Sequence, residues 1–126
     1  MVGSQCILVA DDHEDIRLTL VDILEARGYR VGTASDGSEA VSKVRSRSYC
    51  LVIMDVRMPR KDGPQALKEM KELRPDTPVV MISAYPVEQW GSEVAGYGPV
   101  AMLTKPLDLE QLMRLVEKNC SSERET

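Results

Sequence analysis

Short apolar runs recur along the chain, and longer segments of mixed apolar and polar residues separate them. The runs are CILVA (6–10), VGTA (31–34), CLVIM (50–54), VVMIS (79–83) and VAMLT (100–104). The first, third and fourth are continuously apolar, which is typical of strands that are covered on both faces in a parallel sheet. The pattern therefore predicts five strands, with the second and the fifth at the edges of the sheet.

The segments between the runs carry helical patterns with recognisable ends. Gly28 is placed to end the first helix, and Asp36 with Glu39 forms a capping-box pattern for the second. Pro64 suits the first turn of the third helix, and Asp108 is the N-cap candidate of the last. The apolar positions at helical spacing are Ile16, Leu20, Ile23, Leu24, Ala40, Val41, Val44, Leu67, Met70, Leu73, Leu109, Leu112, Met113 and Val116.

The segment between the fourth and fifth runs has the weakest helical pattern. Tyr85 precedes a proline and is steered away from helical backbone angles, while Gly91 and Gly96 each cost roughly 0.5–1 kcal/mol relative to alanine inside a helix. We predict a short, late-starting or mobile helix at about residues 87–95, with Trp90 as a packing residue.

Alternating strands and helices predict an α/β fold. We expect a (βα)5 doubly wound, flavodoxin-like arrangement: a five-stranded parallel sheet of order 2-1-3-4-5 with helices on both faces. A chain of 126 residues suits one domain. We place this domain at 1–119, followed at 120–126 by a polar tail or the start of a linker. Ligands of such sheets bind beyond the carboxyl ends of the strands, so function is expected there.

Polar side chains follow four of the five predicted strands. Asp11 and Asp12 come after the first, Asp55 after the third, Ser83 ends the fourth and Lys105 follows the fifth. The first and third strands are neighbours in this order, so the three carboxylates converge and repel one another unless a cation lies between them. Carboxylate oxygens suit a hard divalent ion that keeps some of its water, and we therefore predict a Mg²⁺ site.

Asp55 then has a chemical role available. A carboxylate beside a metal ion can attack a phosphoryl group and form an aspartyl phosphate. Lys105 supplies a compact positive charge to the phosphoryl oxygens, and the Ser83 hydroxyl can donate a hydrogen bond to another of them. In isolation each residue also has a plain structural role, such as turn former for Asp55 or helix cap for Asp11 and Asp12. Their joint placement favours the chemical role.

The segments VADDHED, DVRMPRKDG, ISA and LTKP, in this order and at strand ends, resemble the signature blocks of the CheY-like response-regulator receiver domain of two-component signalling. The resemblance spans about residues 5 to 118. It implies a phosphorylation-dependent switch in a phosphorelay, with a sensor histidine kinase or phosphotransfer protein as one partner and an output domain or effector as another. It implies no enzyme activity beyond Mg²⁺-dependent self-phosphorylation and self-dephosphorylation.

The resemblance also assigns roles around the metal. It implies that Asp55 is the phosphoacceptor and that Asp12 binds Mg²⁺ directly, with Asp11 acting through water. Arg57 contributes its backbone carbonyl to the metal. Pro59 and Gly63 shape the loop beside the phosphorylation site.

The resemblance implies a switch that this chain carries in altered form. Ser83 occupies the position of the switching hydroxyl, and Lys105, joined to Pro106 by a cis peptide bond, contacts the phosphate. The family commonly has an aromatic residue three positions before the lysine, and here that position is Met102. Leu107 replaces the frequent phenylalanine after Lys-Pro. Another rearrangement of the fourth helix and fifth strand is then needed to carry the signal.

Composition and charge limit which binding partners and which cellular compartment are expected. The net charge is −4 with scattered Lys and Arg, which argues against direct binding of nucleic acid. No apolar run approaches the ~20 residues that span a bilayer, so no membrane insertion is expected. Cys6, Cys50 and Cys120 are widely spaced without a CxxC pair, so we expect reduced thiols in a cytoplasmic protein and neither a disulfide framework nor a zinc site. His13 is expected to be a solvated loop residue.

Three other functions are weighed against the switch. A degenerate receiver would bind partners without being phosphorylated; Met102 allows this, and the intact acidic set argues against it. A Mg²⁺-dependent aspartyl-nucleophile phosphatase uses the same residue types, but such enzymes resemble one another in a DxDx[TV] block, and DVRMP lacks the second Asp. A flavodoxin-like cofactor carrier needs a first loop rich in phosphate donors, whereas ADDHED would repel a phosphate.

Overall fold

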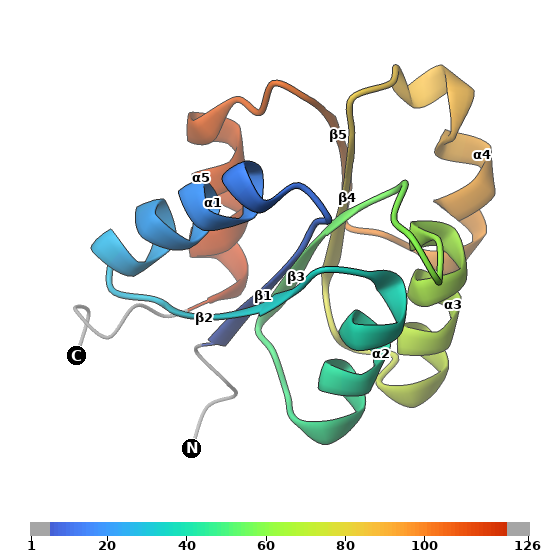
Figure 1. Cartoon of the computed structure of the whole chain (residues 1–126), viewed down its shortest axis with the longest axis horizontal. Helices are drawn as coiled ribbons and strands as arrows, with labels where there is room; N and C mark the ends of the chain where they lie inside the picture. The colour runs from blue at the N-terminus through green and yellow to red at the C-terminus, as the bar shows by residue number, and fades with distance from the viewer. Residues whose placement is uncertain (1–5, 121–126) are drawn as a thin grey trace.

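The computed structural model describes residues 6–120, and its centre is a parallel five-stranded sheet (Figure 1). The strands are β1 (Cys6–Ala10), β2 (Arg30–Ala34), β3 (Leu51–Asp55), β4 (Val79–Ser83) and β5 (Ala101–Thr104). Their order, β2-β1-β3-β4-β5, confirms the prediction, including β2 and β5 as edges. Each strand lies within one residue of its predicted bounds. Residues 121–126 of the predicted tail lie outside the described part of the chain.

Helices cover both faces of the sheet. They are α1 (Glu14–Ala26), α2 (Gly37–Ser46), α3 (Gly63–Leu73), α4 (Gly91–Val94) and α5 (Leu109–Asn119), with short 3-10 turns η1 (Val87–Gln89) and η2 (Ala95–Tyr97) beside α4. α1 and α5 lie on one face, and α2, α3 and α4 lie on the other (Figure 1). The arrangement is the predicted doubly wound fold.

The predicted helix ends are present. The Asp36 carboxylate accepts a hydrogen bond from the Glu39 N–H at 2.8 Å, and Asp108 accepts one from the Gln111 N–H at 3.2 Å. Gly28 follows the end of α1 with a φ of 92°, a left-handed conformation that glycine adopts without strain. Local sequence therefore decides where these helices begin and end.

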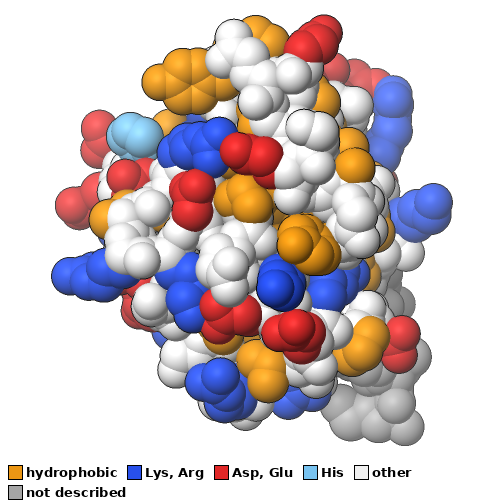
Figure 2. Space-filling model, turned by 90° about the vertical axis from the view of Figure 1, so that its right-hand side faces the viewer, with side chains coloured by type: hydrophobic (Ala, Val, Ile, Leu, Met, Phe, Trp, Pro, Cys, Tyr) orange, Lys and Arg blue, Asp and Glu red, His pale blue; other side chains and the backbone are white. Residues whose placement is uncertain are grey.

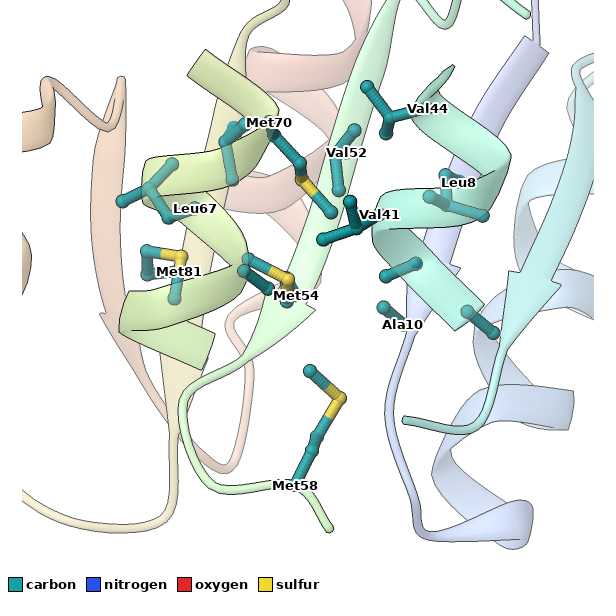
Figure 3. Packing of buried hydrophobic residues seen from close by; sticks show 14 of the residues in the cluster. Leu8, Ala10, Val41, Val44, Val52, Met54, Met58, Leu67, Met70 and Met81 are labelled. Carbon is teal, nitrogen blue, oxygen red and sulfur yellow. The ribbon is translucent and has the colours of Figure 1, made fainter. Parts of the chain in front are cut away.

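Two hydrophobic layers hold the sheet in place. One packs α1 and α5 against Ile7, Val9 and Ile53. The other is rich in methionine, and Figure 3 shows Met54 and Met81 together with side chains of α2 and α3. All five positions of β1, β3 and β4 are buried, and all are apolar except Asp55 and Ser83 at the carboxyl ends of β3 and β4. The carboxyl ends of these strands are thereby fixed relative to one another.

The segment around α4 is broken into short turns, as the weak pattern predicted. Trp90 anchors it: the side chain is 1% exposed, and its Nε1–H donates to the Tyr85 carbonyl oxygen at 2.9 Å. The interpretation of Trp90 as a packing residue is confirmed. Since Tyr85 lies just after β4, this one contact ties the α4 segment to the end of a central strand.

The loop between β3 and α3 folds back tightly on the strand. A Cβ on Gly63 would lie 2.6 Å from the backbone oxygen of Asp55, so only glycine fits there. The Gly63 N–H donates to the Val56 carbonyl at 2.7 Å. A Cβ on Gly37, at the start of α2, would lie 1.8 Å from the Lys61 backbone oxygen. Glycines on two elements thus allow the loop beside Asp55 to take its shape.

A disulfide bond joins Cys50 to Cys120, and their Cα atoms are 5.3 Å apart. The expectation of reduced thiols is therefore wrong for these two residues, while Cys6 carries a buried thiol outside the bond. The two cysteines are 70 positions apart in the sequence. The fold brings the end of α5 beside the start of β3, and the pairing could not be inferred without it.

Reducing this bond is expected to lower the free energy of unfolding by about 2–4 kcal/mol, because the cross-link restricts the unfolded chain. Urea unfolding followed by circular dichroism, with and without a thiol reductant, measures the difference. A Cys6→Ala variant keeps the bond and should respond to the reductant as the wild type does. A Cys50→Ala, Cys120→Ala double variant should not respond. Equal stability of oxidised and reduced wild-type protein would contradict the expectation.

The surface over α3 and α4 is mixed in character. Figure 2 shows acidic and basic side chains interspersed on this face, so that neither sign of charge dominates it. Within residues 6–120, no helix has the length and apolar character needed to cross a bilayer.

Candidate functional site

Polar residues from four strands meet at the carboxyl edge of the sheet. Ala10 of β1 pairs with Met54 of β3, which places Asp11 and Asp55 on neighbouring strand ends. The Lys105 N–H, just after β5, donates to the Ser83 carbonyl at the end of β4 at 2.7 Å. Parallel pairing thus brings together residues that are up to 94 positions apart, as the sequence predicted.

Lys105 lies between two buried carboxylates. Its Nζ is 2.9 Å from Asp11 Oδ2 and 3.3 Å from Asp55 Oδ2. Asp11 is fully buried and Asp55 is 4% exposed. The peptide bond from Lys105 to Pro106 is cis, as the family resemblance implied. The ammonium group is the cation that these two charges require away from water.

Burial raises the pKa of the Asp55 carboxyl above its ordinary value, and the negative charge of Asp11 adds to this rise. Lys105 and the backbone N–H of Arg57 act in the opposite direction but do not cancel it. The ionised form of Asp55 is therefore destabilised in the metal-free protein. Any further cation bound at this edge would favour that form.

The acidic residues are close enough to share one metal ion. One ligand atom from each of Asp11, Asp12, His13 and Asp55 lies within 4.8 Å of all the others. The Asp12 side chain is 33% exposed, so the cluster opens to solvent on that side. Three carboxylates form the oxygen-rich donor set that a hard divalent cation prefers. The residues present therefore fit a Mg²⁺ ion.

His13 is the exposed loop residue that was expected, and its ring also contacts two acids. Its side chain is 64% exposed, yet Nδ1 lies 3.2 Å from Asp11 Oδ1 and 3.3 Å from Asp12 Oδ1. His13 is the N-cap residue of α1, and its backbone N–H donates to Asp11 Oδ1 at 2.9 Å. Neither aspartate is itself the cap residue. The only sequence signal for the ring contacts was the position directly after two acids.

Ser83 lies at the same edge and is buried. Its Oγ accepts a hydrogen bond from the Tyr85 N–H at 3.1 Å. The carbonyl of the same Tyr85 accepts the Nε1–H of Trp90. Two hydrogen bonds through one residue therefore connect the Ser83 hydroxyl with the α4 segment.

The Arg57 side chain makes a bridge that sequence reasoning missed. Its guanidinium lies 2.8 Å from Asp62 Oδ2 and 3.0 Å from Glu93 Oε2. Asp62 ends the loop after β3, and Glu93 belongs to α4. A single side chain two positions after Asp55 thus joins the loop to α4. No pattern in the sequence marks Glu93 as its partner.

Met102 occupies the position at which an aromatic ring is usual. Its side chain is partly buried and packs against the layer that contains Trp90. The Met102 sulfur would lie 3.6 Å from a Cβ on Gly91, so a thioether faces the start of α4. The side chain opposite the α4 segment is therefore flexible and not aromatic.

Comparison with known proteins agrees with this geometry. The family model described as the response regulator receiver domain matches residues 7–117. The transcriptional regulatory protein ZraR of Salmonella typhimurium is 37% identical over 124 residues, which are 98% of this chain and 28% of that protein. PdtaR of Mycobacterium tuberculosis is 37% identical over 120 residues, 94% of this chain and 58% of that protein. The chain spans less than two thirds of either relative.

Solved structures show the same fold. Response regulator TrrA of Thermotoga maritima, solved in complex with Mg²⁺ and BeF, is 31% identical with a TM-score of 0.81, covering 90% of this chain and 97% of that one. CheY4 of Vibrio cholerae is 28% identical with a TM-score of 0.83, covering 93% and 99%. Together, the strand order, the acidic edge and the match over residues 7–117 show that the chain belongs to the response regulator receiver domain family of two-component systems.

Proposed function

We propose that this domain accepts a phosphoryl group on Asp55, with Mg²⁺, from a sensor histidine kinase or a phosphotransfer protein. Phosphorylation then changes how the domain binds an output domain or effector in the cytoplasm. The single observation that supports this most directly is the buried pair Asp11 and Asp55, which share the Lys105 ammonium at 2.9 and 3.3 Å. Residues 1–119 form the receiver in this proposal.

The proposed phosphoryl transfer uses the charged groups of the site. An Asp55 carboxylate oxygen attacks the phosphorus, the bond between phosphorus and the donor's imidazole nitrogen breaks, and the imidazole takes up a proton. Lys105 moves its contacts from the carboxylates to the phosphoryl oxygens. Asp11, Asp12 and Asp55, with the Arg57 carbonyl, would hold Mg²⁺, which neutralises the carboxylates and the phosphoryl group. Ser83 donates its hydroxyl hydrogen to a remaining phosphoryl oxygen.

The route outward from the site passes through Ser83 in this proposal. When the hydroxyl turns to the phosphoryl group, its contact with the Tyr85 N–H changes. Tyr85 holds Trp90 through its carbonyl, so the movement reaches the α4 segment without an aromatic residue at Met102. The Arg57 bridge to Glu93 joins the same segment to the phosphorylation loop.

Incubation with acetyl phosphate and Mg²⁺ tests the proposed function. We expect the intact mass to rise by one phosphoryl group, and the group to be released by hydroxylamine, as an acyl phosphate is. Chelation of Mg²⁺ should prevent the gain, because the single charge of Lys105 then faces three carboxylates and an incoming phosphoryl group. No gain in mass, or a modification that resists hydroxylamine, would overturn the proposal. It would instead support a receiver that binds partners without phosphorylation.

The phosphatase alternative has less support. In its DxDx[TV] block the second acid would fall at Arg57, whose side chain is paired with Asp62 and Glu93. No carboxylate is then available at that position to act as the general acid for a leaving group. The proposed catalysis is limited to the domain's own phosphorylation and dephosphorylation.

A further inference from the structure

We infer that His13 is a direct metal ligand of the acidic site, and that the site binds imidazole-accepting divalent ions such as Co²⁺, Ni²⁺ or Zn²⁺ more tightly than Mg²⁺. This deepens the proposed function, because it concerns the same metal site, but it assigns that site a nitrogen ligand. His13 is the only histidine in the chain. Its Nδ1 belongs to the group of donor atoms that could surround one ion.

The spacing of the donor atoms fits octahedral coordination. Metal–ligand bonds of about 2.1 Å place adjacent donors about 3.0 Å apart and opposite donors about 4.2 Å apart. His13 Nδ1 lies 3.2 Å from Asp11 Oδ1, 3.3 Å from Asp12 Oδ1 and 4.0 Å from Asp55 Oδ2. The first two distances suit adjacent positions, and the third suits the opposite position. All four donor atoms lie within 4.8 Å of one another, so they have to draw slightly closer to share one ion.

The backbone holds His13 where this contact is possible. Its N–H donates to Asp11 Oδ1, and its carbonyl accepts the Arg17 N–H at 3.0 Å in the first turn of α1. The Arg17 guanidinium returns to the Asp11 carbonyl at 2.7 Å. The exposed ring can carry its proton on Nε2, which leaves the Nδ1 lone pair for a metal. The residue is therefore positioned by the same short segment that positions Asp11.

The identity of the preferred ion follows from ligand chemistry. Carboxylate and water ligands suit Mg²⁺, whereas imidazole suits Zn²⁺ and Ni²⁺, and affinities rise along the first-row series toward Cu²⁺. Mg²⁺ loses its water reluctantly and gains little from a nitrogen donor. His13 should therefore strengthen binding of transition ions while leaving the carboxylate-based binding of Mg²⁺ nearly unchanged.

Calorimetric titration of untagged protein with Mg²⁺ and with Co²⁺ tests the inference. We expect wild-type protein to bind Co²⁺ at least about tenfold more tightly than Mg²⁺, and His13→Ala to lose about 10–100-fold of Co²⁺ affinity, since even outer-shell changes cost this much. Affinity of His13→Ala for Mg²⁺ should change less than about twofold. Asp12→Asn should weaken both ions, and Glu14→Ala, next in sequence but outside the cluster, should weaken neither. Equal loss of both ions in His13→Ala would overturn the inference.

Proton NMR with Co²⁺ gives a second readout that does not depend on activity. A ligated imidazole should add a strongly shifted exchangeable N–H signal, and the only imidazole in the chain is that of His13. Backbone N–H groups near the ion can also shift, so the signal is assigned by its loss in a variant. His13→Ala should lack this signal, and its presence there would contradict the assignment. Labelling by acetyl phosphate with Mg²⁺ separates the two proposals. If His13→Ala is labelled normally but keeps its Co²⁺ affinity, only the role of His13 fails; if wild type is never labelled, the phosphoacceptor proposal fails alone.

Discussion

Replacement of Asp55 by asparagine is expected to abolish labelling by acetyl phosphate and, in metal-free buffer, to raise the free energy of unfolding at neutral pH. An amide has no carboxylate oxygen to attack phosphorus, so the loss should be complete. Asparagine keeps the volume of the side chain at this 4% exposed position. Lys105 keeps Asp11 as its partner at 2.9 Å. The variant therefore removes a buried charge without leaving the ammonium alone.

The sign of the stability change follows from the raised pKa of Asp55, which burial and then the charge of Asp11 produce. Between the ordinary carboxyl pKa and this raised value, the native state holds a proton more often than the unfolded state. Stability of the wild type therefore falls as pH rises through this window, and the penalty is present in full above the raised pKa. Asp55→Asn should lack this fall.

Urea unfolding at several values from about pH 4 to 7, in the presence of a chelator, measures both effects. Asp62→Asn is the matched control: it lies in the same loop, its side chain is half exposed, and it pairs with Arg57. That control should be labelled like the wild type. Persistent labelling of Asp55→Asn, or a variant less stable than wild type at neutral pH, would refute the assigned role and electrostatics of Asp55.

Trp90→Ala is expected to lower the free energy of unfolding by about 3–5 kcal/mol, a large share of the 5–15 kcal/mol typical of a whole domain. The side chain is 1% exposed and packs in the layer that also contains Val94 and Met81. Its loss leaves a cavity and an unpaired Tyr85 carbonyl. Circular dichroism is the appropriate signal, because the chain has no other tryptophan to report on unfolding.

Trp90→Phe is the control that separates the contribution of packing from that of the hydrogen bond. The phenyl ring retains much of the packing but cannot donate to Tyr85, so we expect a loss of about 1–3 kcal/mol. A change below about 1 kcal/mol in Trp90→Ala would show that the α4 segment is not anchored by this residue.

Much of the fold could be predicted from the sequence because local sequence patterns determine it. Continuously apolar runs predicted the three central strands, and Asp36 and Asp108 marked helix starts that the structure confirms. The site followed from topology, since Asp55 ends β3 and Lys105 directly follows β5, and the carboxyl ends of these strands lie at one edge of the sheet. Their roles as phosphoacceptor and phosphate contact stay predictions until the labelling experiments are done.

The features that were missed depend on tertiary contacts. The Cys50–Cys120 bond needs the end of α5 to reach the start of β3, which no spacing in the sequence shows. The Arg57 bridge depends on where α4 lies, and the sequence of that segment is weakly helical. His13 is exposed in a loop as predicted, but the contacts of its ring with Asp11 and Asp12 depend on how the loop before α1 folds, and no sequence pattern predicts them.

The disulfide has a mechanical consequence. β3 begins beside Cys50 and ends at Asp55, so the cross-link and the carboxylate lie at opposite ends of one five-residue strand, about 17 Å long. Any segment that follows residue 120 starts from a point that is covalently attached to this strand. A displacement of β3 would therefore be passed to residue 120 through a covalent bond as well as through packing.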